Sequence, residues 1–435
     1  MNLMKIVKKV LNRGASECFV ISTKTTSCNV EIERDKISST EWVQSIGLTI
    51  YTIVGKRIAS VTVRDLSEDS IKKAIDLSYK LANSVTPNIY WSGLPEPKSY
   101  PTPLETYDPK LRNLDVDEVV ELAKTCISTV KDFDKRVSIA KGGVTISYGE
   151  VSIANSNGIE GDDYGTLFSV YLLTLAKSAS EISSYVSEEE YSRKFDIDVE
   201  EVALRAAKRA IETLGAKSVR SFKGDVVFDY YLAADLFTTL SIAYNGDYIW
   251  RGSSPLKNKL GEEIAVNDLT IIDDGLLPGG IETSKFDGEG TPRQRTLIIE
   301  KGVLKNFINN TYTARILNME PTGNASSLLT VSPSNIVVKP GSSKLEDLIS
   351  EVKKGLLIRE FSGMMRFQDG VISGTVKQSF YIENGEIKYP VKECMISDNL
   401  YSMLKRIDGI SKETRRVYNV LTPCIRVRDV TIIGK

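Results

Sequence analysis

Two spacings of apolar residues alternate along the chain and predict the order of its elements. Apolar side chains recur at helical spacing over residues 3–11 and 65–83, where they predict amphipathic helices. Between these helices the apolar residues recur at every second position, which predicts β-strands. The expected strands cover 17–25, 27–37, 43–55 and 57–65, and Gly55 with Lys56 forms a tight turn between the last two.

The middle of the chain predicts a connector followed by further helices and strands. Residues 86–113 are rich in proline and predict an extended connector, too irregular to be an element of the core. Asp115 and Glu118 form a capping box for a helix that ends near residue 133, and another amphipathic helix over 198–214 ends at Gly215. Strand-rich segments are expected at 136–155 and 167–185. Helices beside a mixed or antiparallel sheet indicate an α+β domain, which we place at residues 1–215.

A second domain is expected over residues 223–435, because strands become more frequent and glycine-rich loops appear after a boundary at 216–223. Paired strands are expected around the turns at 300–302 and 383–386. The remaining expected elements are short helices at 311–317, 344–354 and 399–409 and a closing strand at 423–433. The predicted fold class is therefore α+β with two domains, the second of them strand-rich around a central apolar helix.

That central helix follows a strand that begins near residue 226. Asp229 is a suitable N-cap, and Asn245 with Gly246 ends the helix. The apolar residues between them recur at spacings of three and four, as on a helix face that packs against a core. They are Leu232, Ala233, Leu236, Phe237, Leu240, Ala243 and Tyr244. Core packing accounts for this face without any catalytic role.

Composition excludes several functional classes. The net charge is −1, and the basic residues lie among acids or on polar helix faces, so we expect no nucleic-acid binding. No apolar run approaches the roughly 20 residues that span a bilayer, and residues 1–14 are too polar for a secretory signal. We therefore expect a cytoplasmic protein that does not associate with membranes.

The counts of histidine and cysteine exclude further chemistry. The chain has no histidine, which excludes histidine-activated nucleophiles, histidine-ligated zinc and histidine acid–base catalysis. Its five cysteines include no Cys-x-x-Cys pair, which argues against a zinc cluster or a disulfide framework.

Polar groups in the glycine-rich loops have both functional and structural interpretations. The carboxylates of Asp273, Asp274, Asp287 and Glu289 are of the type that binds a hard cation, but aspartate and glycine are also ordinary turn formers. Both interpretations predict these residues in loops.

Two arginines near the same loops also have two interpretations. Arg293 and Arg295 can bind the carboxylate of a peptide or partner, or they can form surface salt bridges. Tyr248, Trp250 and Arg251 form an aromatic and cationic cluster in the loop after the central helix. This cluster suits a protein interface or a loop folded onto its own domain.

Six segments carry a resemblance to a known family. They are RGSSPLKNKLGEEIA (251–265), LTIIDDGLLPGG (269–280), FDGEGTPRQRTLIIEKGVLKNFINNTYTARIL (286–317), TGNAS (322–326), KKGLLIREFSGM (353–364) and FYIENGEIKYPV (380–391). In this order they resemble the TldD/PmbA family, also called the modulator of DNA gyrase family. Residues 45–75 resemble the N-terminal strands and helix of the same family more loosely.

The resemblance implies where a metal site would lie. In the TldD branch of the family, the central helix carries H-E-x-x-x-H, and two histidines with a C-terminal cysteine hold a zinc-type metal for peptide hydrolysis. The corresponding positions here are Phe237, Thr238 and Ile242, none of which can serve as a histidine ligand or as the glutamate base. Cys424 aligns beyond the cysteine ligand of the family. The resemblance therefore predicts no catalytic residue, cofactor or metal in this chain.

This pattern resembles the PmbA branch, also called TldE. It implies a non-catalytic subunit that joins a TldD-type metallopeptidase subunit, with the metal, expected to be zinc, in that partner and with peptides or unfolded proteins as substrate. A stand-alone peptide-binding or structural homodimer is the alternative, and a regulator of nucleic acid or topoisomerase is suggested only by the older family name. Family membership also implies that dimers form.

Overall fold

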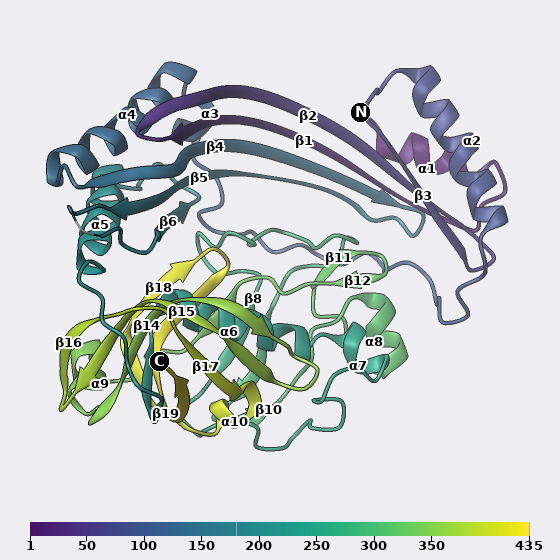
Figure 1. Ribbon diagram of the computed structural model, residues 1–435. Helices are drawn as coiled ribbons and strands as arrows, with labels where there is room; N and C mark the ends of the chain where they lie inside the picture. Colours follow the sequence, from purple (N-terminus) through teal and green to yellow (C-terminus); the bar gives the residue numbers. More distant parts are fainter. Residues whose placement is uncertain (180, 435) are drawn as a thin grey trace.

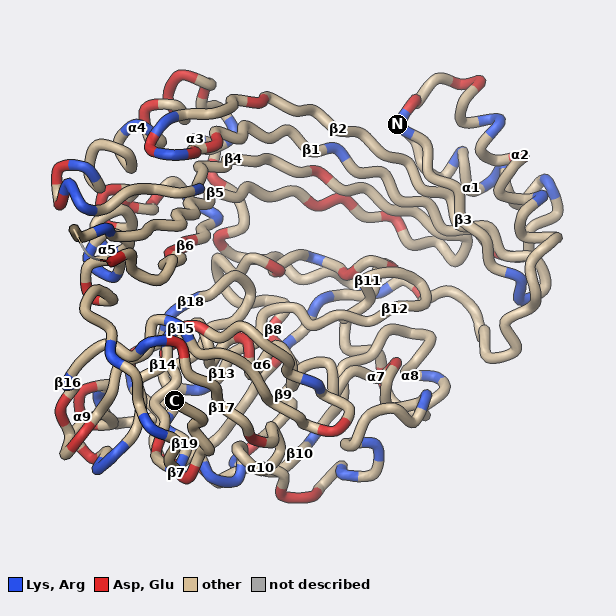
Figure 2. Tube along the Cα trace, viewed as in Figure 1, with Lys and Arg blue, Asp and Glu red and all other residues tan. Residues whose placement is uncertain are grey.

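The structure is a computed structural model that describes residues 1–179 and 181–434. Figure 1 shows a long curved sheet that arches over a barrel-like body. In Figure 2, lysine and arginine are interspersed with aspartate and glutamate over both parts. None of the helices among the described residues is long and apolar enough to cross a membrane.

The arch is an antiparallel six-stranded sheet within the described residues, in the order β3-β2-β1-β4-β5-β6. Its strands are β1 (Glu17–Glu33), β2 (Lys36–Val54), β3 (Arg57–Val63), β4 (Val137–Asn155), β5 (Glu160–Ala176) and β6 (Val186–Ser192). The expectation of separate strands at 17–25 and 27–37 is wrong, because β1 pairs with β2 without interruption from Glu17 to Glu31. The alternation of side chains continues through Thr26, so one strand forms.

Helices cover the two ends of the arch (Figure 1). They are α1 (Leu3–Leu11) and α2 (Glu68–Ser84) at one end, and α3 (Pro109–Asn113), α4 (Val116–Phe133) and α5 (Val199–Glu212) at the other. The capping box predicted at Asp115 and Glu118 is present. Each end therefore has its own apolar core, and the middle of the sheet lies between them.

The proline-rich segment joins the arch to the body. Its backbone is irregular over 86–108, as expected, but residues 109–113 form helix α3, because Asp108 caps the helix and Pro109 suits its first turn, so the predicted extended connector is wrong there. Trp91 and Leu94 are buried in an apolar cluster with residues of both parts. The Trp91 Nε1 donates to Glu17 on β1 at 2.7 Å, while Arg315 of the body donates to the carbonyl of Ser92 at 2.8 Å. The expectation that this segment contributes nothing to a core is therefore wrong.

The body is built around a closed barrel. Strands β7 (Phe222–Phe228), β14 (Lys354–Met365), β15 (Val371–Glu383), β17 (Cys394–Asn399) and β19 (Val420–Ile433) follow one another, and β19 pairs back onto β7. The other strands are β8 (Ile271–Asp274), β9 (Arg295–Glu300), β10 (Val303–Leu304), β11 (Ala325–Ser327), β12 (Thr330–Val331), β13 (Ile336–Val338), β16 (Glu386–Val391) and β18 (Ile407–Val417). The helices are α6 (Tyr230–Ala243), α7 (Gly246–Trp250), α8 (Thr311–Leu317), α9 (Leu345–Ser350) and α10 (Leu400–Leu404). The whole is an α+β fold.

Candidate functional site

Helix α6 is fixed at both ends by side chains that the sequence singles out. At its start, the Asp229 carboxylate accepts a hydrogen bond from the Tyr230 N–H at 2.7 Å. After its end, the Asn245 side chain accepts from the Asp247 N–H at 2.9 Å, and its amide donates to the carbonyl of Val331 at 2.9 Å. Residues 248–251 were expected in a loop, but Asn245 caps the new helix α7 there. These bonds hold α6 at a defined position in the body.

The three positions on α6 that the resemblance assigns to the family motif do not share one face. Phe237 is 0% exposed in the core of the body, whereas Thr238 is exposed and Ile242 is partly buried. A residue advances about 100° around a helix, so Thr238 and Ile242 lie on the same stripe as Asp235, and Phe237 lies on the opposite side. A metal bound by side chains at 237 and 242 would require these two positions to converge, and here they diverge.

The exposed stripe of α6 faces two further carboxylates. Burial, followed by the charges of Glu189 and Glu360, raises the pKa of Asp235 to about 6. Glu360 on β14 accepts from the Ser187 hydroxyl and from the Gln378 amide, each at 2.7 Å. Among the described residues, no group of three or more histidine, cysteine, aspartate or glutamate side chains has the arrangement to hold a metal ion. The stripe therefore faces an acidic surface, on which Glu360 is held by neutral donors.

An unpaired strand edge lies next to this stripe. β7 pairs with β14 only from Gly355 to Ile358, while β15 pairs with β14 as far as Met365. Among the described residues no strand pairs with the second edge of β14 over 360–365. The Thr239 hydroxyl on α6 lies 3.9 Å from the sulfur of Met365, so the helix runs beside this edge. Such an edge can bind an extended segment through its backbone.

The edge opens onto a cavity of about 1000 Å³ between the arch and the body. Residues 181–185 of the arch line one side, and β14, β15 and β17 line the other. Large apolar side chains at or near this cavity remain exposed: Ile182 by 66%, Tyr185 by 55%, Met364 by 49% and Met395 by 40%. A strand edge beside exposed apolar side chains suits a peptide or a segment of a protein partner.

A buried ionic cluster fastens the arch to the start of α6. Glu188 on β6 is 0% exposed and accepts from Arg205 at 3.0 Å, from Arg209 at 2.9 Å and from Arg415 on β18. Burial raises the pKa of Glu188, but the charges of Arg209, Arg415 and Arg205 outweigh it, and the net pKa lies below the ordinary value. Glu188 is therefore ionised and joins the two parts of the chain.

The same cluster extends to the N-cap of α6. Asp229 accepts from Arg209 at 2.9 Å and lies 3.5 Å from the guanidinium of Arg359. The Cys424 thiol lies 3.8 Å from Asp229, and burial raises its pKa well above the ordinary value. Cys424 is thus a protonated thiol beside a carboxylate, which is unfavourable for a metal ligand.

The acidic residues that were expected in loops have internal partners. Asp273 and Asp274 both lie in β8, so their predicted place in a loop is wrong. Asp273 accepts from Asn324 at 2.8 Å and from Ser334. Asp287 accepts from three backbone N–H groups, those of Glu289, Thr291 and Ala325. Burial raises the pKa of Asp287 to about 6 and that of Glu289 to about 8. These carboxylates accept hydrogen bonds from the surrounding backbone and so stabilise the loops in which they lie.

The basic and aromatic candidate residues also make contacts within the chain. Arg293 donates to the carbonyl of Gly323 at 2.7 Å, and Arg295 lies 3.4 Å from Asp274. Trp250 packs on Tyr90 of the connector, with ring centroids 5.3 Å apart. The structure thus favours an intramolecular role for each of them.

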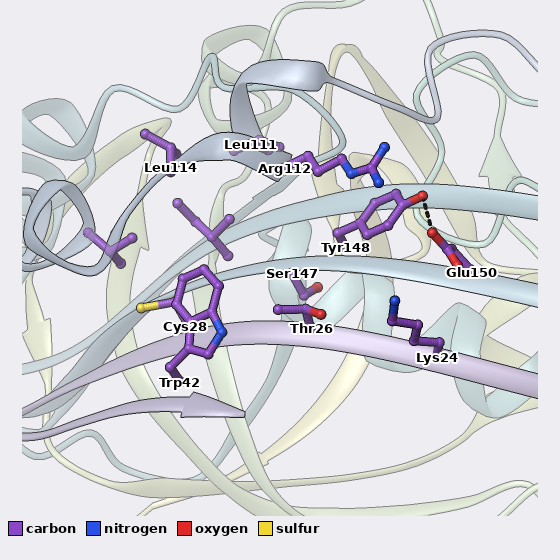
Figure 3. Close-up of a pocket in the computed structure, with 12 residues that line it drawn as sticks. Lys24, Thr26, Cys28, Trp42, Leu111, Arg112, Leu114, Ser147, Tyr148 and Glu150 are labelled. Carbon is purple, nitrogen blue, oxygen red and sulfur yellow. Dashed lines mark hydrogen bonds between the residues drawn. The ribbon is translucent and has the colours of Figure 1, made fainter. Parts of the chain in front are cut away.

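A second, smaller cavity of about 140 Å³ lies between the arch and helices α3 and α4 (Figure 3). Its walls are apolar at one end, with Trp42, Leu111 and Leu114, and carry Lys24 and Arg112 at the other. Arg112 lies over the ring of Tyr148 at 4.5 Å, and the Tyr148 hydroxyl donates to Glu150 at 2.7 Å. The sequence gives no sign of this cavity, because its residues come from separate elements.

Sequence reasoning also missed Glu188, Asp235 and Glu360. Asp235 lies on α6 itself, Glu360 lies on β14 of the body and Glu188 lies on β6 of the arch, so only the packing of these three elements brings the carboxylates to the same region. The sequence did contain one signal for Glu188. Arg205 and Arg209 are four residues apart on one helix and can therefore both donate to a single carboxylate.

Comparison with known proteins identifies the family. Sequence models of three PmbA/TldA metallopeptidase domains match the chain: domain 1 at residues 18–82, the central domain at 109–214 and the C-terminal domain at 221–434. The chain belongs to the PmbA/TldD family. The metalloprotease PmbA of Escherichia coli O157:H7 is 26% identical over 96% of this chain and 92% of its own length.

Relatives in archaea are similar over comparable lengths. An uncharacterised protein of Methanocaldococcus jannaschii is 28% identical over 93% of this chain and 94% of its own. The crystal structure of TldE from Thermococcus kodakarensis superposes with a TM-score of 0.93 at 25% identity, covering 99% of this chain and 100% of that one. The arch and body are therefore the fold of this family.

Proposed function

We propose that this chain is the non-catalytic subunit of a heteromeric metallopeptidase that acts on peptides or unfolded proteins. A TldD-type subunit would supply the metal, expected to be zinc, and the chemistry of hydrolysis. The observation that carries the proposal is the set of side chains at the motif positions of α6. Phe237 is buried, and Thr238 and Ile242 provide neither a metal ligand nor a base.

The cavity between arch and body, which residues 360–362 of β14 help to line, supports a role in holding peptide or partner. The free edge of β14 offers backbone donors and acceptors, and the exposed apolar side chains around the cavity offer contact surface. Homologues named TldD and homologues named PmbA are both similar to this chain, which is consistent with paired subunits. The near-neutral net charge of −1 gives no support to nucleic-acid binding.

Co-purification from the native host tests the proposal. The chain is tagged, the complex is isolated, and its metal content and cleavage of an unfolded peptide are measured with and without a chelator. We expect a TldD-type subunit in the complex, with metal and chelator-sensitive cleavage that the isolated chain lacks. Recovery of the chain without any such subunit would instead favour a stand-alone peptide-binding homodimer.

A further inference from the structure

The smaller cavity lies on the face of the arch that points away from the body. On β1, Phe19 belongs to the apolar cluster that contains Phe286 of the body. Successive residues of a strand point to opposite faces, and the pairing of β1 with both of its neighbours is regular over this stretch. Lys24, Thr26 and Cys28 line the cavity and therefore lie on the opposite face, which α3 and α4 cover (Figure 1).

The floor of this cavity changes from apolar to charged along the strands. It is formed by three neighbouring pairs of β1 and β4, which are Cys28 with Ile146, Thr26 with Tyr148, and Lys24 with Glu150. The roof follows the same order. Leu111 lies at the apolar end, while the guanidinium of Arg112 lies over the ring of Tyr148 at 4.5 Å (Figure 3). A ligand with one apolar part and one charged part therefore fits in a single orientation.

The charged end carries two cations and one carboxylate. Among the described residues, neither Lys24 nor Arg112 forms an ion pair with a carboxylate. Within the same part of the chain, the Tyr148 hydroxyl is the one donor to Glu150, at 2.7 Å. Two positive charges beside one negative charge favour a singly charged anion over a doubly charged phosphate. The remaining acceptor capacity of Glu150 suits an N–H group of the same ligand.

The size of the cavity limits the apolar part of the ligand. Its volume is about 140 Å³. An apolar cavity of about 150 Å³ admits benzene, so one side chain of the size of leucine or phenylalanine fills the space. The apolar end provides contacts for such a side chain, since Leu111 and Leu114 are buried and Trp42 is half-exposed at the rim. A second residue of a peptide would lie outside the cavity.

We propose that this cavity binds one apolar amino-acid residue that ends in a free carboxylate, supplied either as a free amino acid or as the last residue of a peptide. The carboxylate accepts from Arg112 and Lys24, and the planar guanidinium suits its two oxygens. The nitrogen of the residue donates to Glu150, and its side chain packs against Trp42 and Leu111. The site does not include α6, so its failure would leave the proposed subunit role untouched.

Isothermal titration calorimetry on the full-length chain tests the proposal with four probes. They are glycyl-glycyl-leucine, its C-terminal amide, triglycine and free leucine. We expect glycyl-glycyl-leucine to bind, and the amide to bind at least about tenfold more weakly because it lacks the charge that pairs with the cations. Triglycine should also bind at least about tenfold more weakly, because it has no apolar side chain. Free leucine that binds as tightly as the tripeptide assigns the site to amino acids, and much weaker binding assigns it to peptide ends.

Arg112→Ala should weaken binding of glycyl-glycyl-leucine by at least about tenfold, because it removes the guanidinium from the charged end. The matched control is Arg64→Ala, since Arg64 is an exposed arginine that follows β3 and does not line the cavity. This control should bind as wild type. Both arginines are exposed, so neither change should affect folding, which far-UV circular dichroism verifies.

Four results would overturn the proposal. They are an absence of binding for both glycyl-glycyl-leucine and leucine, an amide that binds as tightly as the free acid, an Arg112→Ala variant that binds as wild type, and full displacement of the tripeptide by an equal concentration of acetate. The last result would show that the cations bind any small anion.

Discussion

Replacing Glu188 by glutamine should be among the most damaging single changes outside the apolar core. The glutamine keeps the shape of the side chain but leaves Arg205, Arg209 and Arg415 without the carboxylate between them. Each contact at about 3 Å contributes about 5–6 kcal/mol of Coulomb attraction at an effective dielectric constant near 20, before desolvation is subtracted. Breaking a buried ion network by removing one partner typically costs about 3–5 kcal/mol.

Equilibrium unfolding in urea, followed by far-UV circular dichroism, measures this cost. Because Glu188 joins arch and body, we expect the Glu188→Gln variant to unfold in two separated transitions, with the first at much lower urea than wild type. Glu190→Gln is the matched control, since Glu190 contacts the same Arg205 but its side chain is 40% exposed. Loss of the Glu190 charge should lower the free energy of unfolding by about 1 kcal/mol or less.

The pH dependence gives an independent test of the same reasoning. The pKa of Glu188 is lowered in the folded chain, mainly through Arg209 and Arg415 against the effect of burial. Its stabilisation is therefore present above its ordinary value of 4.5 and is lost as the pH falls through the lower folded pKa. A Glu188→Gln variant within about 1 kcal/mol of wild type near pH 7 would refute this account of the interface.

Three other changes test the description of α6. Phe237→Ala should lower the free energy of unfolding by about 3–5 kcal/mol, while Thr238→Ala should change it by less than about 0.5 kcal/mol, as measured by urea denaturation. Asp235→Asn should raise the melting temperature above about pH 6 but not near pH 4, because a raised pKa penalises the charged form as the pH rises. The gain should stay below about 1 kcal/mol, since burial of the Asp235 carboxyl is incomplete and the solvent that still reaches the side chain screens the charges of Glu189 and Glu360. Asn245→Ala removes both the cap of α7 and the bond to Val331, and a loss under about 1 kcal/mol would contradict the role assigned to it.

Local chemistry explains which elements could be predicted from the sequence. The capping box at Asp115, the turn at Gly55 and the paired strands around residues 300–302 depend on neighbours within a few positions, and all are present. The single long strand β1 was divided in the prediction, although the alternation of side chains continues through Thr26. Helix α7 was missed because five residues are too few for a periodic signal.

The candidate site depends on contacts that no local pattern encodes. Phe237, Thr238 and Ile242 were located through the family resemblance, but their different exposure follows from the orientation of α6 in the body. The free edge of β14 exists because its neighbouring strand β7 ends early. The sequence predicts the length of each strand approximately, but it does not show which strands will be neighbours or which neighbour ends first.

The metal content of the purified chain, alone and mixed with a TldD-type subunit, tests the central proposal most directly. Both samples are loaded with zinc, freed of excess ion, and analysed by mass spectrometry beside a peptide-cleavage assay. We predict no stoichiometric zinc and no cleavage for the chain alone, and bound zinc with chelator-sensitive cleavage for the complex. One equivalent of zinc retained by the chain alone, with cleavage that a chelator abolishes, would contradict the proposal.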